Sequence, residues 1–158
     1  MIRKALLEDL PILLEIYENA RAYMAKSGNP NQWGKSNQPK ETLVDDIHKN
    51  RLYVYEKNKE ILGSFMFTTE ADPTYSVIEG SWISDTKYGV IHRVASSGKE
   101  KGVMDKIVAF CWNEIAHLRI DTHEDNVTMQ KAIFRNGFKE CGIIYLLNGE
   151  PRIAYEKV

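Results

Sequence analysis

Residues 91–104 constrain the fold most, because a stretch of strand character runs through a short loop with glycines into an amphipathic helix. A helix that begins in this way leaves backbone N–H groups without intrahelical partners and turns the positive end of its dipole toward the loop. The segment therefore predicts a phosphate site, although an ordinary strand-to-helix loop with solvated lysines fits the same residues. The apolar positions recur at the spacing of one buried helix face: Met104, Ile107, Val108, Cys111, Trp112 and Ile115.

Length and composition indicate one ordinary globular domain over residues 1–158. The chain is 43% hydrophobic and 27% charged with a formal net charge of -1, which gives no electrostatic case for binding nucleic acid or an anionic membrane. No apolar run approaches the roughly 18 residues of a membrane span, and charges follow too soon after Met1 for a signal peptide. We expect a cytoplasmic protein in which Cys111 and Cys141 are apolar fillers without a disulfide.

The order of predicted elements favours an α/β domain with a mixed sheet. Asn126 is a natural N-cap for the last helix and Gly137 its C-terminal stop. Asn148 and Gly149 predict a two-residue turn in the closing hairpin. We expect strands at 1–5, 52–56, 61–68, 91–96, 118–123, 138–147 and 152–157, and helices at about 10–27, 41–50, 104–115 and 127–136.

Two connections are expected to carry function. Residues 29–34 are rich in turn-forming residues yet contain Trp33, which needs apolar contacts. Residues 69–89 form a long connection with aromatic side chains, and such connections are usually functional or disordered. The aromatic content favours a packed loop, with a short strand around 75–82.

Two motifs resemble the GNAT superfamily of acyl-coenzyme A-dependent N-acyltransferases. Its loop pattern, Arg/Gln-x-x-Gly-x-Gly/Ala between a strand and a helix, is similar to residues 99–104, with Lys99 first, Gly102 central and Met104 last. Residues 126–138 are similar to the family's helix that begins with Asn and ends in Gly-Phe. The resemblance covers nearly the whole chain. It implies a mixed, mainly antiparallel, twisted sheet of six to seven strands with helices on both faces.

The resemblance also implies direct attack of an amine on the thioester of acetyl-coenzyme A (acetyl-CoA), with no metal. In the family, the loop before the helix binds the pyrophosphate, the preceding strand pairs with the pantetheine arm, and a backbone N–H near a bulge donates to the thioester oxygen. Here Val94 would carry that N–H. The implied cofactor contacts are Val94, Ala95, Ser96, Lys99, Glu100, Lys101, Gly102, Val103, Met104, Asn126 and Phe134.

Glu79 and His92 are the candidates for the general base, with Glu79 ranked first by analogy with carboxylates that the family places near its central strand. A lone histidine on a strand is often only a hydrogen-bonded core residue. Phe134 occupies the position where the family usually has a tyrosine that protonates the departing thiolate, so that role is vacant. A thiol with a pKa near ~8.5 is a tolerable leaving group without an acid.

We expect the acceptor to be a small molecule with a primary amine that is cationic in solution, held by aromatic and acidic side chains. Two alternatives stay open: a metal site from His92, Asp121 and His123, and a non-catalytic sensor that binds acyl-CoA. A homodimer also stays open. The expected acceptor contacts are Trp33, Tyr75, Trp82, Asp121 and His123.

Overall fold

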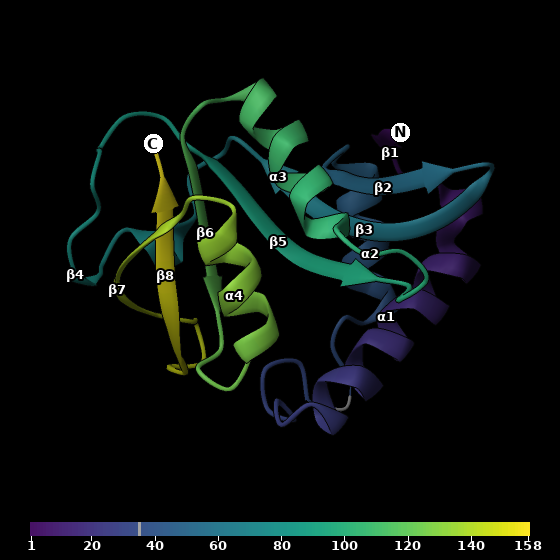
Figure 1. Cartoon of the computed structure of the whole chain (residues 1–158), viewed down its shortest axis with the longest axis horizontal. Coiled ribbons are helices and arrows are strands. Elements are labelled where there is room, and N and C mark those ends of the chain that lie inside the picture. The colour runs from purple at the N-terminus through teal and green to yellow at the C-terminus, as the bar shows by residue number, and fades with distance from the viewer. Residues whose placement is uncertain (35) are drawn as a thin grey trace.

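A computed structural model describes residues 1–34 and 36–158, which form one mixed sheet with helices on both faces (Figure 1). The strand order is β1-β2-β3-β5-β6-β8-β7-β4, and all neighbours are antiparallel except β5 and β6. The predicted fold class is confirmed with eight strands rather than six or seven, because a two-residue strand in the long connection pairs with β7 at the sheet edge. The strands are β1 (Ile2–Lys4), β2 (Leu52–Lys57), β3 (Glu60–Thr68), β4 (Glu79–Gly80), β5 (Gly89–Ser96), β6 (Leu118–Thr122), β7 (Lys139–Tyr145) and β8 (Pro151–Lys157).

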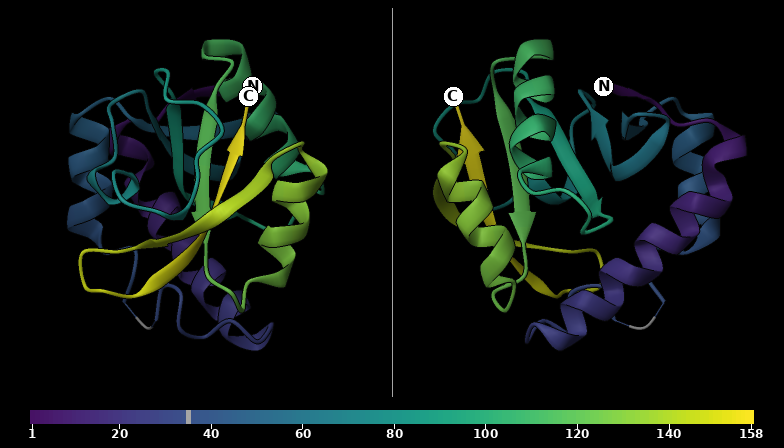
Figure 2. Two further views of the ribbon diagram at one scale, coloured as in Figure 1. Left: turned by 90° about the vertical axis from the view of Figure 1, so that its left-hand side faces the viewer. Right: turned by 45° about the vertical axis from the view of Figure 1, so that its right-hand side comes forward.

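The helices divide between the two faces of the sheet (Figure 2). Helices α1 (Leu10–Lys26) and α2 (Lys40–His48) cover one face and bury a core around Leu13, Leu43 and Leu52. Helices α3 (Val103–Glu114) and α4 (Val127–Arg135) cover the other and bury the larger core, which includes Ile107 and Ile133. None of the helices in the described ranges is long and apolar enough to cross a membrane.

The two central strands separate soon after they begin. In the described sheet, the pairing of β5 with β6 is confined to Gly89 with Leu118 and Val90 with Arg119. Beyond Val90 the two strands diverge, and this divergence is visible in Figures 1 and 2. The sheet therefore opens into a wedge between the C-terminal half of β5 and the end of β6.

Strand β5 contains a bulge next to this wedge. Met66 of β3 pairs with His92, whereas Ser64 pairs with Ala95, so β5 has one more residue than β3 between the two pairs. Arg93 takes up the bulge with a φ of 53°, a left-handed conformation that is uncommon for a residue other than glycine. The Arg93 carbonyl accepts a hydrogen bond of 2.6 Å from the buried Tyr17 hydroxyl of α1. The bulge is thus fixed from the α1 side of the sheet.

The closing hairpin differs from its prediction in the turn. The Leu146 N–H donates to the Glu150 carbonyl at 2.9 Å, so Leu147, Asn148 and Gly149 form a three-residue loop rather than a two-residue turn. Gly149 has a φ of 86° and its N–H donates to Leu146, which is the geometry of a turn followed by a left-handed residue. Asn148 and Gly149 lie in the turn as predicted, but β7 ends at Tyr145 rather than at 147, and β8 begins at Pro151 rather than at 152.

Candidate active site

A cavity of about 760 Å³ opens beside the wedge. Strand β5 contributes His92 and Val94 to its wall, and β6 contributes Asp121. The loop after α1 contributes Trp33, and the long connection contributes Asp72. Segments far apart in the sequence therefore meet in one site.

His92 lies between two carboxylates in this cavity. Its Nε2 is 2.7 Å from Asp72 Oδ2, and its Nδ1 is 3.7 Å from Asp121 Oδ2. The Tyr75 hydroxyl donates to the same Asp121 oxygen at 2.6 Å. Asp72 also accepts hydrogen bonds from the Thr74 N–H at 2.8 Å and the Thr74 hydroxyl at 2.6 Å. An ionised Asp72 can accept only the proton on Nε2, so the neutral imidazole has Nδ1 as its basic nitrogen.

The environment shifts the pKa of two groups in this cluster. Burial alone would raise the pKa of Asp72, but the hydrogen bonds from His92 and Thr74 outweigh it and lower that pKa to about 2. Burial, together with the neighbouring Asp121 carboxylate, raises the pKa of Tyr75 well above its ordinary value. Tyr75 therefore remains a neutral hydrogen-bond donor and Asp72 remains an anion at neutral pH.

Two arginines on the cavity wall share one buried carboxylate. Asp46 of α2 is fully buried, and its two oxygens lie 2.7 Å from Arg51 Nε and 2.7 Å from Arg93 Nε. Arg93 Nη2 makes a further bond of 3.0 Å to Asp46. Both arginines line the cavity, with 23% of the Arg51 side chain and 19% of the Arg93 side chain exposed.

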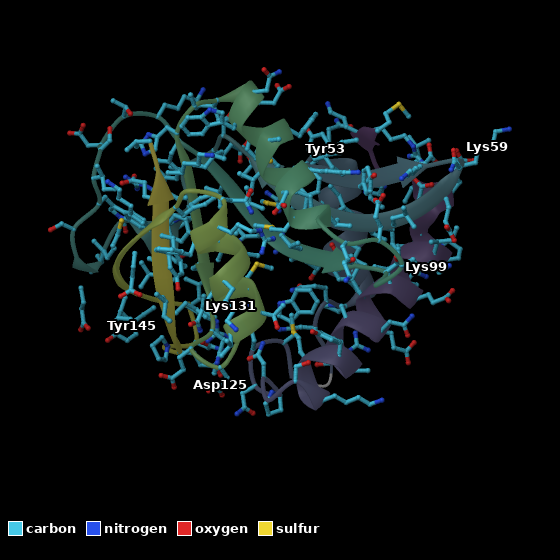
Figure 3. All side chains as sticks on the ribbon, in the orientation of Figure 1. Tyr53, Lys59, Lys99, Asp125, Lys131 and Tyr145 are labelled. Atoms are coloured by element: carbon cyan, nitrogen blue, oxygen red, sulfur yellow. The ribbon has the colours of Figure 1, made fainter. Side chains whose placement is uncertain are left out.

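The loop that precedes α3 has the features expected of a phosphate site. Gly102 is the N-cap residue of α3, with a φ of 77° that disfavours any side chain. Lys99, labelled in Figure 3, projects from the loop but its Nζ lies 2.7 Å from Glu60 Oε2, so its charge is already paired. Hydrogen bonds from Lys57 and Tyr55 lower the pKa of Glu100 to about 2. The groups that this loop offers to an anion therefore include the backbone N–H groups of the first turn of α3, which have no intrahelical partners.

Asn126 is confirmed as the N-cap of α4, because its side chain accepts a 3.0 Å hydrogen bond from the Met129 N–H. Its amide nitrogen donates to Gln32 Oε1 at 2.9 Å, which ties the loop after α1 to α4 across the open end of the wedge. Arg152 of β8, with only 4% of its side chain exposed, donates to the Gln32 carbonyl at 3.1 Å. Gln32 thus joins the two halves of the molecule next to the cavity.

Some of the residues expected at the site lie in the cavity or directly behind it. Val94, Trp33, Asp121 and Asn126 line the cavity. Tyr75 is buried behind Asp121 rather than exposed to an acceptor. The other expected cofactor contacts continue from the cavity along the end of β5 into the first turn of α3: Ala95, Ser96, Lys99, Glu100, Lys101, Gly102, Val103 and Met104.

Four expected residues are placed elsewhere. Glu79 is exposed on the edge strand β4, opposite Ile143 of β7, and is not among the described residues around the cavity. Phe134 is 78% exposed on α4 and is not among the described residues that line the cavity. His123 lies in the turn between β6 and α4, where its Nδ1 accepts from the Asp125 N–H at 3.0 Å. Trp82 packs on Arg119, away from His92. None of these four residues is among the described residues that line the cavity, so their expected roles stay predictions.

The structure does not bring together the three residues of the metal alternative, His92, Asp121 and His123. Within the described ranges, no group of three histidine, cysteine, aspartate or glutamate side chains is arranged to hold a metal ion. His92 and Asp121 do approach each other, but His123 points into its own turn.

Sequence reasoning missed several residues that shape the site. Asp72 lies in the long connection without a signal of its own, and its approach to His92 depends on how that connection folds. Arg51, Arg93 and Asp46 gave no signal, because a shared carboxylate between α2 and β5 is a tertiary contact. Gln32 is next to Trp33 in a loop that is expected to carry function, but only the tryptophan pointed to that loop, and nothing pointed to Gln32 itself.

No family model matches the sequence, and no curated protein sequence matches it. Solved structures do match. A GNAT-family acetyltransferase from Streptococcus agalactiae has a TM-score of 0.90 and 28% identity, over 100% of this chain and 94% of that chain. The same fold is found in an aminoglycoside acetyltransferase in complex with coenzyme A and kanamycin. Its TM-score is 0.69 and its identity 17%, over 100% of this chain and 94% of that chain. A ribosomal-protein-alanine N-acetyltransferase from Brucella melitensis also has this fold, with a TM-score of 0.65 and 17% identity over 100% of this chain and 99% of that chain. With its fold matched along the whole length by a GNAT-family structure of 28% identity, the predicted resemblance of this chain to the GNAT superfamily is confirmed.

Proposed function

We propose that this protein is an N-acetyltransferase that transfers the acetyl group of acetyl-CoA to the primary amine of a small molecule, with His92 as general base. The observation that carries the proposal is His92 in the cavity, with Asp72 at 2.7 Å on one ring nitrogen and Asp121 at 3.7 Å from the other. A nitrogen base oriented by a carboxylate is the arrangement that proton transfer from an attacking nucleophile requires.

The residues present fit acetyl-CoA. Divergence of β5 from β6 leaves backbone on the inner side of β5 for the pantetheine arm, and the Val94 N–H beside the bulge is the donor for the thioester oxygen. Gly102 allows backbone to approach the pyrophosphate closely, since no side chain stands at the start of α3. The aminoglycoside acetyltransferase with the same fold was solved with coenzyme A.

In the reaction, Asp72 holds the His92 ring in the tautomer that leaves Nδ1 free to accept a proton. An ammonium group beside Nδ1 is attracted by Asp121 and loses one proton to His92, and the resulting amine attacks the thioester carbon. The tetrahedral intermediate then expels the thiolate as the C–S bond breaks, and the second proton of the nitrogen passes to solvent as the amide forms. Asp72 and Asp121 then flank the positive imidazolium. Phe134 is exposed on α4 and has no proton to give, so the thiolate leaves without an acid from that position.

The test is a His92→Asn variant assayed with acetyl-CoA and a panel of small amines. We expect kcat to fall by about 10²–10⁴ while the Kd for acetyl-CoA, measured by calorimetry, stays near wild type. Glu79→Gln is the matched control and should retain activity, because Glu79 is exposed on β4.

Two results would overturn the proposal. If His92→Asn loses only a few-fold in kcat, His92 is not the base. If the wild-type protein binds acetyl-CoA tightly but acetylates none of the amines, the chain is a sensor of acyl-CoA rather than an enzyme that acts on small amines.

A further inference from the structure

The part of the cavity near His92 has charges of both signs on its walls. Glu70, Asp72 and Asp121 supply carboxylates, and Arg51 and Arg93 supply guanidinium groups. An acceptor that carries only an amine would use the first set and leave the second without a function in binding.

The arginine pair keeps a net positive charge. Asp46 is the one carboxylate that both guanidinium groups share, at 2.7 Å from each Nε. The next carboxylate, Asp45, lies 3.5 Å from Arg51 Nη2 but is also paired with Lys49 at 2.9 Å. Three cations therefore face two carboxylates in this cluster, and one positive charge remains.

Both arginines also keep donors for a ligand. Within residues 1–34 and 36–158, the hydrogen bonds of Arg93 use Nε and Nη2, and the contacts of Arg51 use Nε and Nη2. The Nη1 group of each therefore has capacity for an acceptor oxygen. A guanidinium fork matches the geometry of a carboxylate.

On this basis we infer that the acceptor is an amino acid or another amino-carboxylic acid, whose carboxylate binds Arg51 and Arg93 while its amine faces His92 and Asp121. The inference rests on the proposed function. His92 and Arg93 are consecutive residues of β5, and the left-handed conformation of Arg93 at the bulge lets both line the cavity. The carboxylate site is thereby placed next to the base.

The experiment compares kcat/KM for acid and amide pairs: glycine with glycinamide, β-alanine with its amide, and 4-aminobutyrate with its amide. The acid has the negative charge that Arg51 and Arg93 would bind, and the amide lacks it. For the pair whose distance between amine and carboxylate fits the cavity, we expect Arg51→Gln to lower the ratio of kcat/KM for the acid to kcat/KM for the amide by about tenfold to a hundredfold. Because the ratio is compared between proteins, the intrinsic reactivity of each amine cancels.

Two variants serve as controls. Arg51→Lys keeps a positive charge and should keep part of the preference for the acid. Arg3→Gln removes another arginine that bridges two carboxylates, Asp9 at 2.9 Å and Glu56 at 3.2 Å, but far from the cavity on β1, so the ratio should stay at the wild-type value. If Arg51→Gln fails to fold, the ratios of kcat/KM for acid and amide in the wild type and in Arg51→Lys still test the inference.

A wild-type protein that acetylates acids and amides equally well would overturn the inference and leave the proposed function standing. A preference for the acid that survives Arg51→Gln would place the carboxylate elsewhere and overturn the assignment to the arginine pair. Failure to acetylate any amine, with acetyl-CoA bound, would instead count against the proposed function.

Discussion

Replacing Asp72 by asparagine tests the central contact of the site, because it removes the charge beside His92 while keeping the side-chain shape. The pKa of Asp72 lies at about 2, against an ordinary value of 3.8. Each pKa unit corresponds to 1.36 kcal/mol, so the ionised carboxylate stabilises the folded state by about 2 kcal/mol. The direction is clear: a depressed folded-state pKa gives stability that is present above about pH 4 and lost as the pH falls toward 2.

Urea denaturation at pH 7 and pH 3 measures this effect. We expect Asp72→Asn to be less stable than wild type by about 2 kcal/mol at pH 7, with the difference shrinking at pH 3. Asp85→Asn is the matched control, because Asp85 is an exposed carboxylate in the same connection. Its stability should follow wild type at both pH values.

The same variant should also affect catalysis. An asparagine amide can donate to Nε2, which would place the ring proton on Nδ1 and remove the base. We expect kcat to fall by about 10²–10⁴ with the Kd for acetyl-CoA unchanged. A stability loss that is equal at pH 3 and pH 7 would refute the charge argument. A kcat near wild type would refute the pairing of Asp72 with His92.

Two further predictions concern the cofactor side and the bulge. Gly102→Glu should weaken acetyl-CoA binding at least tenfold in calorimetry, because it adds a negative charge and a side chain at a φ of 77°. The control Gly102→Ala adds only the backbone strain and should weaken binding less. Equal affinity in the wild type and both variants would refute the phosphate site. Tyr17→Phe removes the hydroxyl that donates to the Arg93 carbonyl at 2.6 Å, so we expect the free energy of unfolding in urea to fall by about 1–3 kcal/mol and kcat to fall as well. An unchanged kcat in the destabilised protein would show that the bulge does not depend on Tyr17.

The elements with strong local signals could be predicted from the sequence. The strand, glycine loop and helix of residues 91–104 have a clear apolar period, and the structure forms β5 and α3 there. Asn126 and Gly137 mark the ends of α4 through their own backbone preferences, and Gly137 has a φ of 87°. These predictions held because each depends on interactions within a few residues.

The base could not be chosen from the sequence. The sequence offers both Glu79 and His92 as candidates, and only strand pairing shows that Glu79 lies on the sheet edge and His92 at the wedge. The conformation of Arg93 was equally hidden, since nothing in the side chain of arginine favours a φ of 53°. Tyr17, far away in sequence, supplies the hydrogen bond that supports it.

The long connection shows most clearly how the site depends on tertiary contacts. Its outer end is fixed to β6 by Arg119, whose guanidinium lies 4.0 Å from the ring centres of both Trp82 and Tyr88. Glu156 of β8 accepts the Ser84 N–H at 3.2 Å and pairs with Arg119 at 2.7 Å. Hydrogen bonds with His117 and Arg119 help lower the pKa of Glu156 against the opposing effect of burial, so this carboxylate stays charged.

These anchors lie on the half of the sheet that does not contain His92. The connection nevertheless brings Asp72 to β5, where the Asp72 N–H donates to the Tyr88 hydroxyl at 3.1 Å and its carboxylate reaches His92. The cluster therefore spans the split in the sheet, with His92 on β5 and Asp121 on β6. A change in the angle between β5 and β6 would move His92 relative to Asp121. In the proposed mechanism, the wedge that admits acetyl-CoA therefore also sets the geometry of proton transfer.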